Sequence, residues 1–443
     1  MPLLGYPVPL WPVSGSQAVQ MTELNKRPVT TGTLAGSMII AGTAIGAGML
    51  ANPTATSGLW FFGSVLLLAY VWFCMCMSGL MLLEVNLGFA PGASFHSMVS
   101  QLLGRTWNLV SGVSIVFVLY SLTYAYIYVG GGLTQEAFHA VAEWAAWDWL
   151  MLERKQAACL FLLALAACVT SSTRWVGYLS TLLIAGMLGS FFLATGSLLG
   201  QAKWAVLLNR EAGQSSIYWQ FALFALPVCL ASFGFHGNVP SLVLYYRQDR
   251  RRVARSIIQG SLLALILYVV WQVAVQGNLP RSEFASVIAA DGDVAVLLQS
   301  LSAHVDTSGS GIVLTAFAYM AIASSFLGVT LGLFDYLRDL CGWPHSLCGR
   351  TKTALLTFAP PLLAYLVMPT GFVRVMGYVG LMAAIWAVLV PALLLRASRK
   401  KFPRQQPIVP GGHWMIGFVI LFAVLVLVAQ ILLLAGWLPV YQG

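Results

Sequence analysis

In the stretch Gly42-Thr43-Ala44-Ile45-Gly46-Ala47-Gly48, a glycine-rich sequence interrupts an apolar segment long enough to cross a membrane. A second apolar segment is interrupted by Ser232-Phe233-Gly234-Phe235-His236-Gly237-Asn238. A helix in hydrocarbon satisfies its own backbone, so an unwound stretch is tolerated only where it lines a cavity or is buried in protein. Two such interruptions, at corresponding positions of two halves, are typical of the binding site of a membrane transporter.

The composition excludes a soluble globular protein. Of 443 residues, 59% are hydrophobic and 8% are charged, whereas soluble domains carry about 25% charged residues. The apolar segments are roughly 17 to 28 residues long, which suits membrane-spanning helices and not barrel strands. We therefore predict an all-α polytopic membrane protein with eleven spans, at 33–57, 60–88, 106–132, 157–173, 176–200, 216–243, 256–276, 311–334, 353–369, 372–396 and 413–437.

The loops between these spans differ in charge. If the amino terminus is cytoplasmic, most Lys and Arg residues fall in cytoplasmic loops, including the run Arg250-Arg251-Arg252. The two long external loops, roughly 133–156 and 277–310, are acidic instead. Positive residues accumulate in short cytoplasmic loops, so this pattern predicts a cytoplasmic amino terminus and an external carboxyl terminus. The net charge of +9 follows from that topology, and we expect the lipid bilayer as a partner and no nucleic acid.

The chain is predicted to have one folded domain. Residues 1–30 are rich in Pro and Gly and contain no signal-peptide cleavage site, so they are predicted to be a disordered cytoplasmic tail, with Met21 as an alternative start. Residues 31–443 would form a single transporter domain. The seven cysteines have no metal-ligand spacing. We predict no metal site and no cofactor.

The two interruptions suggest an internal symmetry. Spans one to five, about 33–200, and spans six to ten, about 216–396, can be laid over each other with opposite orientation. Both interruptions then fall near the middle of the membrane, as inverted-topology repeats require. The last span, 413–437, would lie outside the symmetric core.

Unwinding a helix exposes backbone groups that can bind charge. The amino-terminal ends of half-helices offer N–H groups to a carboxylate, and freed carbonyls suit an ammonium group or a cation. Glycines at 42, 46 and 48 permit unusual backbone angles and the close approach of a ligand. A zwitterionic amino acid would use both polarities. The alternative is a helix-packing seam of small residues, since Gly42 and Gly46 have GxxxG spacing.

The sequence contains six distinctive blocks, at residues 42–49, 78–86, 117–126, 230–241, 323–337 and 356–361. These blocks resemble the bacterial aromatic amino acid permeases, and most of all their tryptophan type. The resemblance implies a LeuT-like core, with two inverted five-helix repeats, broken helices one and six, and an eleventh helix. It also implies proton-driven import of an aromatic amino acid across the inner membrane of a Gram-negative bacterium, with the carboxyl terminus in the periplasm.

One position departs from the family. Where relatives tend to carry a lysine in the fifth span, this chain has Met187. An intramembrane lysine is suited to coupling, because burial depresses its pKa and protonation supplies a movable charge. The route of proton coupling is therefore open.

Two titratable residues are candidates for proton coupling. Glu84 is the carboxylate well inside a predicted span; as alternatives, it could bond the broken first helix or lie at the cytoplasmic interface. His236 lies in the second interruption and titrates near neutral pH, so it is predicted to gate or to contact substrate. The alternative for His236 is a neutral ring that caps freed backbone groups.

Hydroxyl and aromatic side chains complete the predicted site. Tyr120 and Tyr124 share a helix face, while Tyr126 points elsewhere. Ser324 and Ser325 form a possible cation site, with helix packing as the alternative. The resemblance implies that Phe233, Phe235 and Phe326 lie beside the aromatic ring of the substrate. The predicted substrate-binding residues are Gly42, Thr43, Ala44, Gly46, Ala47, Gly48, Tyr120, Tyr124, Ser232, Phe233, Gly234, Phe235, His236, Asn238 and Phe326.

Other classes of protein fit the sequence less well. An integral-membrane enzyme needs a polar catalytic cluster, and the six histidines are scattered. A channel needs a filter loop or a ring of charges. We therefore predict import of tryptophan by proton symport with alternating access. The alternatives are a sodium-coupled or uncoupled carrier or exchanger of the same fold, and a membrane sensor that binds without transport.

Overall fold

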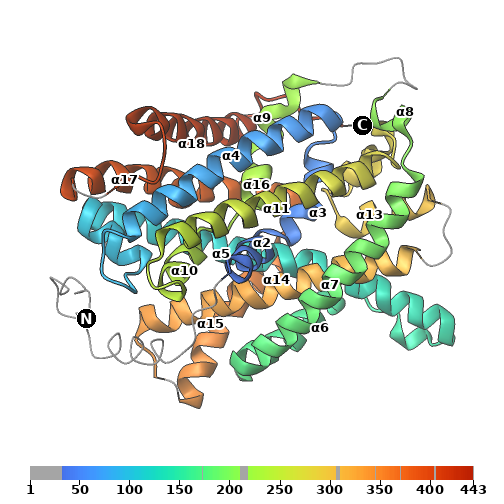
Figure 1. Cartoon of the computed structure of the whole chain (residues 1–443). Coiled ribbons are helices and arrows are strands. Elements are labelled where there is room, and N and C mark those ends of the chain that lie inside the picture. Colours follow the sequence, from blue (N-terminus) through green and yellow to red (C-terminus); the bar gives the residue numbers. More distant parts are fainter. Residues whose placement is uncertain are drawn as a thin grey trace.

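The computed structural model describes residues 32–442 apart from 172, 210–217, 306–309, 345, 370 and 404–405, so the predicted tail 1–30 lies outside the described residues. The described residues form a bundle of helices with no strand. Most helices run between two faces of the bundle (Figure 1). We call the face where α10 and α17 end the first face (left in Figure 1), and the face with α8 and α13 the second face (right).

The first predicted span is broken, as the sequence indicated. It consists of α2 (Leu34–Ala44) and α3 (Ala47–Ala55), whose axes are bent by 52°. The helix α5 (Phe95–Ala145) is kinked at Gly104, which has a φ of 83° and lies just before the predicted span 106–132. The helices that complete this half are α4 (Trp60–Asn86), α5 (Phe95–Ala145), α6 (Arg154–Ser171), α7 (Thr173–Gln201) and the short α8 (Trp204–Leu207).

The second half repeats this order. Its first span is again broken, and its last span contains a π-helical segment, η5 (Ala384–Leu389). The elements are η2 (Trp219–Phe221), α9 (Ala222–Ser232), η3 (His236–Asn238), α10 (Val239–Tyr245), α11 (Arg250–Gln276), α14 (Ser310–Cys341), α15 (Leu347–Val367), α16 (Phe372–Ala383) and α17 (Val390–Lys401), followed by α18 (Gly412–Leu434).

Ten of the eleven predicted spans coincide with helices of membrane-spanning length and composition. Nine such helices occur among the described residues, and the bent pair α2 and α3 makes the tenth. The remaining predicted span, 353–369, coincides with α15, which is less apolar because its first turns include Arg350 and Lys352. Arg350 donates two hydrogen bonds to the Thr170 carbonyl, at 2.6 and 3.0 Å, and so caps the end of α6.

Both long loops predicted at the second face contain helix. α5 continues to Ala145, and the segment 277–310 carries η4 (Arg281–Glu283), α12 (Phe284–Ala289) and α13 (Val294–Ala303). Asp293 caps α13 by accepting from the Ala295 N–H at 2.9 Å. Its carboxylate also pairs with Arg154 at 2.5 Å. This ion pair fastens the polar loop to the start of α6.

Candidate functional site

The first helix break lies at Ile45 and Gly46, inside the predicted glycine-rich stretch. α2 ends at Ala44, Ile45 is extended and α3 begins at Ala47. Close packing explains two of the glycines. A Cβ on Gly46 would collide with Ser325 Oγ of α14, and a Cβ on Gly48 would lie 2.7 Å from the Ser232 Cα. Gly42 has no neighbour within 4 Å of its Cβ position, so packing does not require a glycine there.

The second break lies where predicted and is bonded to the first. α9 ends at Ser232, and the chain becomes helical again at η3 and α10. Ser232 Oγ lies 3.0 Å from the Gly48 carbonyl oxygen. Asn238 Nδ2 donates to Thr43 Oγ1 at 2.5 Å. Polar side chains of one break therefore contact the other break at two separate points.

A tyrosine that the sequence analysis did not select joins the two breaks. Tyr268 of α11 is completely buried, and its hydroxyl lies 2.5 Å from the Ala44 carbonyl oxygen and 2.6 Å from the Ser232 carbonyl oxygen. These carbonyls are at the carboxyl ends of α2 and α9, where a carbonyl accepts no hydrogen bond from its own helix. The Tyr268 hydroxyl lies within hydrogen-bond distance of both carbonyl oxygens and shares its one hydrogen between them. The sequence signal was a hydroxyl-bearing residue near the middle of an apolar span.

Tyr126 is the tyrosine of α5 that approaches the first break. It is buried and shares a hydrogen bond with Ser325, whose Oγ abuts Gly46. Tyr120 and Tyr124 do share a face, but that face packs on α15. Their hydroxyls donate to the carbonyls of Leu356 and Met368 at 2.7 and 2.8 Å. Tyr126 is therefore the tyrosine of α5 that reaches the first break, whereas Tyr120 and Tyr124 contact α15; contact of these two with substrate stays a prediction.

The aromatic residues of the predicted site face different ways. The Phe233 ring packs on Tyr268, with the ring centres 5.0 Å apart. Phe326 instead stacks on Phe358 of α15 and meets Phe161 of α6 edge to face. Phe326 therefore packs among α6, α14 and α15, and its contact with the ring of the substrate stays a prediction.

Of the two serines proposed for a cation, Ser325 alone contacts the break. Ser324 donates to the Ala321 carbonyl within α14 at 3.2 Å. Within the described ranges, no three His, Cys, Asp or Glu side chains are grouped so as to hold a metal ion.

The ring of His236 packs against its neighbour Phe235 and against the π-helical segment η5. Its ring is 1% exposed, stacks on Phe235 at 4.6 Å and meets Trp386 of η5 edge to face at 6.2 Å. Neither ring nitrogen has a hydrogen-bond partner of good geometry among the described residues, although the Met75 backbone approaches it. The same π-helical segment accepts a hydrogen bond from Ser78 of α4 at the Ala387 carbonyl. Segments of this kind are frequent at functional sites.

Glu84 lies at the first face and bonds other elements than the broken first helix. Oε1 accepts from Arg399 Nε at 2.8 Å, and Oε2 accepts from Arg399 Nη2 at 3.2 Å. Oε2 also accepts from the backbone N–H groups of Ile408 and Val409 at 2.6 and 2.9 Å. Glu84 thus joins the end of α4 to α17 and to the segment before α18.

The fold and the site together define a class. A multi-pass helical bundle whose two broken helices meet at its centre is a membrane transport protein with a LeuT-like fold, and not an enzyme. The chain belongs to the tryptophan/tyrosine permease family, which matches residues 29–430.

Comparison with known proteins agrees with this assignment. The chain is 55% identical over 410 residues to a tryptophan-specific transport protein of Haemophilus influenzae, covering 93% of this chain and 98% of that protein. It is 47% identical over 409 residues to a tryptophan-specific transport protein of Pseudomonas aeruginosa, covering 92% and 96%. Among solved structures, MhsT in complex with L-phenylalanine is similar with a TM-score of 0.55 and 14% identity, covering 93% of this chain and all of that one. This last likeness concerns the fold.

Proposed function

We propose that the chain imports tryptophan through the site between its two helix breaks, by alternating access. The observation that carries the proposal is the Tyr268 hydroxyl, which contacts the terminal carbonyls of both α2 and α9. The carboxyl end of a half-helix carries partial negative charge, so these carbonyls suit the ammonium group of an amino acid. The free N–H groups at the start of α3 suit its carboxylate.

The aromatic ring would lie against Phe233 and Tyr126. Phe233 packs on Tyr268, and Tyr126 reaches the first break through Ser325. The choice of tryptophan rests on the names of the relatives. The Tyr268 hydroxyl holds the two carbonyls close together, and each carbonyl oxygen keeps a second lone pair for the ammonium group. Separation of the two breaks would lose this arrangement, which gives the site a binding state and a releasing state.

We also propose that a proton drives uptake and that His236 carries it. A buried imidazole with no good partner is costly when charged, so protonation would favour a state in which the ring leaves Phe235 and Trp386. Glu84 is the weaker candidate, because both of its carboxylate oxygens already accept hydrogen bonds within a fixed contact among α4, α17 and the segment before α18. The first face would be cytoplasmic and the membrane the bacterial inner membrane.

Sodium is the second candidate as the coupling ion. Ser325 Oγ lies against Gly46, where the break leaves backbone carbonyls without helical partners. A hydroxyl beside free carbonyls is a fitting set of oxygen ligands for a small cation. Uptake under a proton gradient without sodium distinguishes the two ions.

The first experiment measures uptake of radiolabelled tryptophan into proteoliposomes with an inward proton gradient and no sodium. Proton symport predicts accumulation above equilibrium that a protonophore abolishes. Accumulation that requires a sodium gradient instead would reject the proton and support the Ser325 site. Binding without flux under either gradient would reject transport and leave a sensor.

Replacing Tyr268 by phenylalanine tests the substrate site. The variant removes the hydroxyl that holds the ends of α2 and α9 together in the binding geometry, and a lost hydrogen bond of this kind costs about 1–3 kcal/mol. We expect a rise of roughly tenfold or more in the apparent KM for tryptophan. Tyr124→Phe is the matched control, because it removes a hydroxyl bonded to α15 and should leave the KM unchanged. Equal KM values in both variants would remove Tyr268 from the site.

A further inference from the structure

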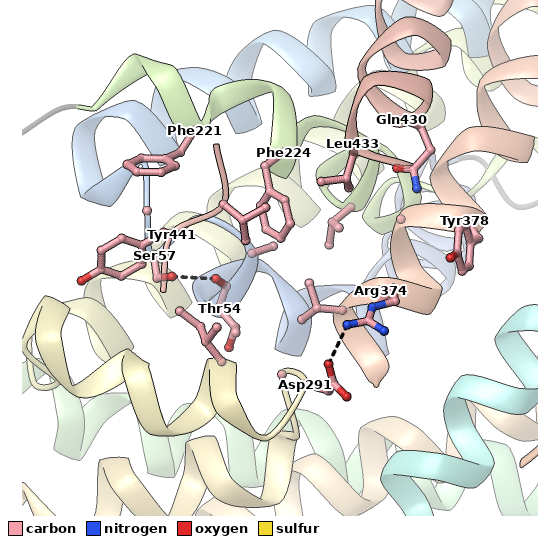
Figure 2. A pocket seen from close by; sticks show the side chains of 18 of the residues that line it. Thr54, Ser57, Phe221, Phe224, Asp291, Arg374, Tyr378, Gln430, Leu433 and Tyr441 are labelled. Atoms are coloured by element: carbon pink, nitrogen blue, oxygen red, sulfur yellow. Dashed lines mark hydrogen bonds and ion pairs between the residues drawn. The ribbon is translucent and has the colours of Figure 1, made fainter. Parts of the chain in front are cut away.

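A cavity that is partly open to solvent lies on the second-face side of the breaks, apart from the site just described. Its volume is about 430 Å³, which is within the range of roughly 300–1,000 Å³ for small-molecule sites. Its walls come from α3, α9, α16, α18 and the turn between α12 and α13 (Figure 2), and they include Val228, one turn before Ser232.

One buried polar atom in this cavity has no partner. Gln430 of α18 lines the cavity and is 1% exposed, and its Oε1 accepts no hydrogen bond within the described part of the chain. An unpaired buried acceptor costs about 1–3 kcal/mol. Gly377 makes room for it, since a Cβ there would lie 3.2 Å from Oε1. The cavity therefore presents an acceptor to an N–H donor that the protein does not supply.

A pair of opposite charges lies elsewhere on the cavity wall. Arg374 Nη2 is 3.1 Å from Asp291 Oδ1, and both side chains are partly exposed (Figure 2). Asp291 and Gly292 both have positive φ, and this turn packs directly on the start of α16 at Gly371 and Val373. The turn thus holds the carboxylate beside the guanidinium. Such a pair matches the carboxylate and ammonium of a zwitterion.

The remaining walls are aromatic and aliphatic. Phe224 of α9 and Leu433 of α18 point toward the middle of the cavity (Figure 2). Tyr441, near the end of the chain, closes one side, because its ring stacks on the Arg281 guanidinium at 3.9 Å and its hydroxyl donates to the Arg281 carbonyl at 3.1 Å. Arg281 in turn donates to the Gly58 carbonyl at 3.1 Å.

We propose that this cavity is a second binding site for an aromatic zwitterionic amino acid with an N–H donor on its ring. The ring N–H bonds Gln430, the ring lies against Phe224, and the head group pairs with Arg374 and Asp291. Gly377 lies beside Gln430 and is three residues from Arg374 on α16, so the Cα atoms of Gly377 and Arg374 are about 4.5 Å apart along the helix axis. A ligand with an indole ring and an amino acid head group can therefore contact Gln430 and the Arg374–Asp291 pair at the same time. The inference deepens the proposed function, because it assigns the same substrate class to a second place.

The test is equilibrium binding of radiolabelled tryptophan to the purified full-length chain in detergent. We expect two molecules per chain in the unaltered protein. Gln430→Leu and Arg374→Gln should each leave one, and Tyr268→Phe should weaken only the other component by about tenfold. Ile431→Leu, next to Gln430 but 60% exposed, is the matched control and should retain two. The Arg374 side chain is 61% exposed, so Arg374→Gln should fold and can test the cavity even if Gln430→Leu does not fold.

Each outcome decides between the two proposals. One bound molecule that Tyr268→Phe weakens and the cavity variants leave intact would overturn the second site while the central site stands. One bound molecule lost with Gln430→Leu or Arg374→Gln, and unaffected by Tyr268→Phe, would support the cavity and reject the central site. No binding at all would overturn both.

Discussion

A Gly48→Ala variant is expected to lose most of its tryptophan uptake, although the change adds one methyl group. The new Cβ would lie 2.7 Å from the Ser232 Cα and 2.8 Å from its Oγ. Relief requires the two breaks to move apart, because the nearest atom belongs to the backbone. Over-packing costs about 1–3 kcal/mol, which corresponds to roughly 5- to 140-fold in affinity. Initial uptake rates and tryptophan binding, per folded molecule, measure the effect.

Gly42→Ala is the matched control for this substitution. The same methyl group meets nothing within 4 Å there. Alanine within a helix is favoured over glycine by about 0.5–1 kcal/mol, so the variant should fold at least as well and transport normally. A Gly42→Ala variant that loses uptake would show that substrate, and not packing, requires the glycine at position 42. Normal uptake in Gly48→Ala would refute the close contact between the breaks.

A Glu84→Gln variant is expected to lose stability by about 3 kcal/mol, because a buried ion pair loses one partner. Glu84 is almost fully buried and its partner Arg399 is 22% exposed, so the guanidinium remains largely out of water without its counter-charge. The new amide also turns a donor toward groups that are themselves donors. Thermal unfolding in detergent measures the loss, and proton-driven accumulation per folded molecule should persist.

The Arg399→Leu variant and the double variant provide the control. If Glu84 acts through this ion pair, the two single losses are similar and the double variant is less than their sum. A coupling role predicts a different result: Glu84→Gln abolishes accumulation while its unfolding temperature stays near normal, and Arg399→Leu retains accumulation. That outcome would return Glu84 to the proton pathway in place of His236.

Helix interruptions were predictable because their signal is local. The glycines around Ile45 and the sequence from Ser232 to Asn238 cannot continue an ordinary helix, and the structure places both breaks inside these stretches. The spans were predictable for a similar reason, since a run of apolar residues of membrane length has few other uses. Helices inside the polar loops have no such signal. The helices α12 and α13 are too short for a span, so the sequence predicts a polar loop where they lie.

The direction in which a side chain points could not be predicted. In a soluble helix the polar face marks the outside, but here lipid and protein interior are equally apolar, so a helix such as α5 or α18 carries no periodic signal. The sequence therefore does not distinguish Tyr124, which bonds the end of α15, from Tyr126, which reaches the first break, and does not single out Tyr268. Glu84 was recognised as buried, but its partner Arg399 is 315 residues away in sequence.

The amino-acid sequence alone predicts the class of protein, the approximate limits of ten of the eleven predicted spans, and the two places where the backbone opens. These follow from composition and from residues adjacent in the chain. Only the tertiary structure decided which groups meet at the breaks: Tyr268 on the carbonyls of Ala44 and Ser232, and Ser325 on Gly46. The physical reason is that these contacts depend on helix rotation, which packing between distant helices sets and which an evenly apolar sequence does not encode locally.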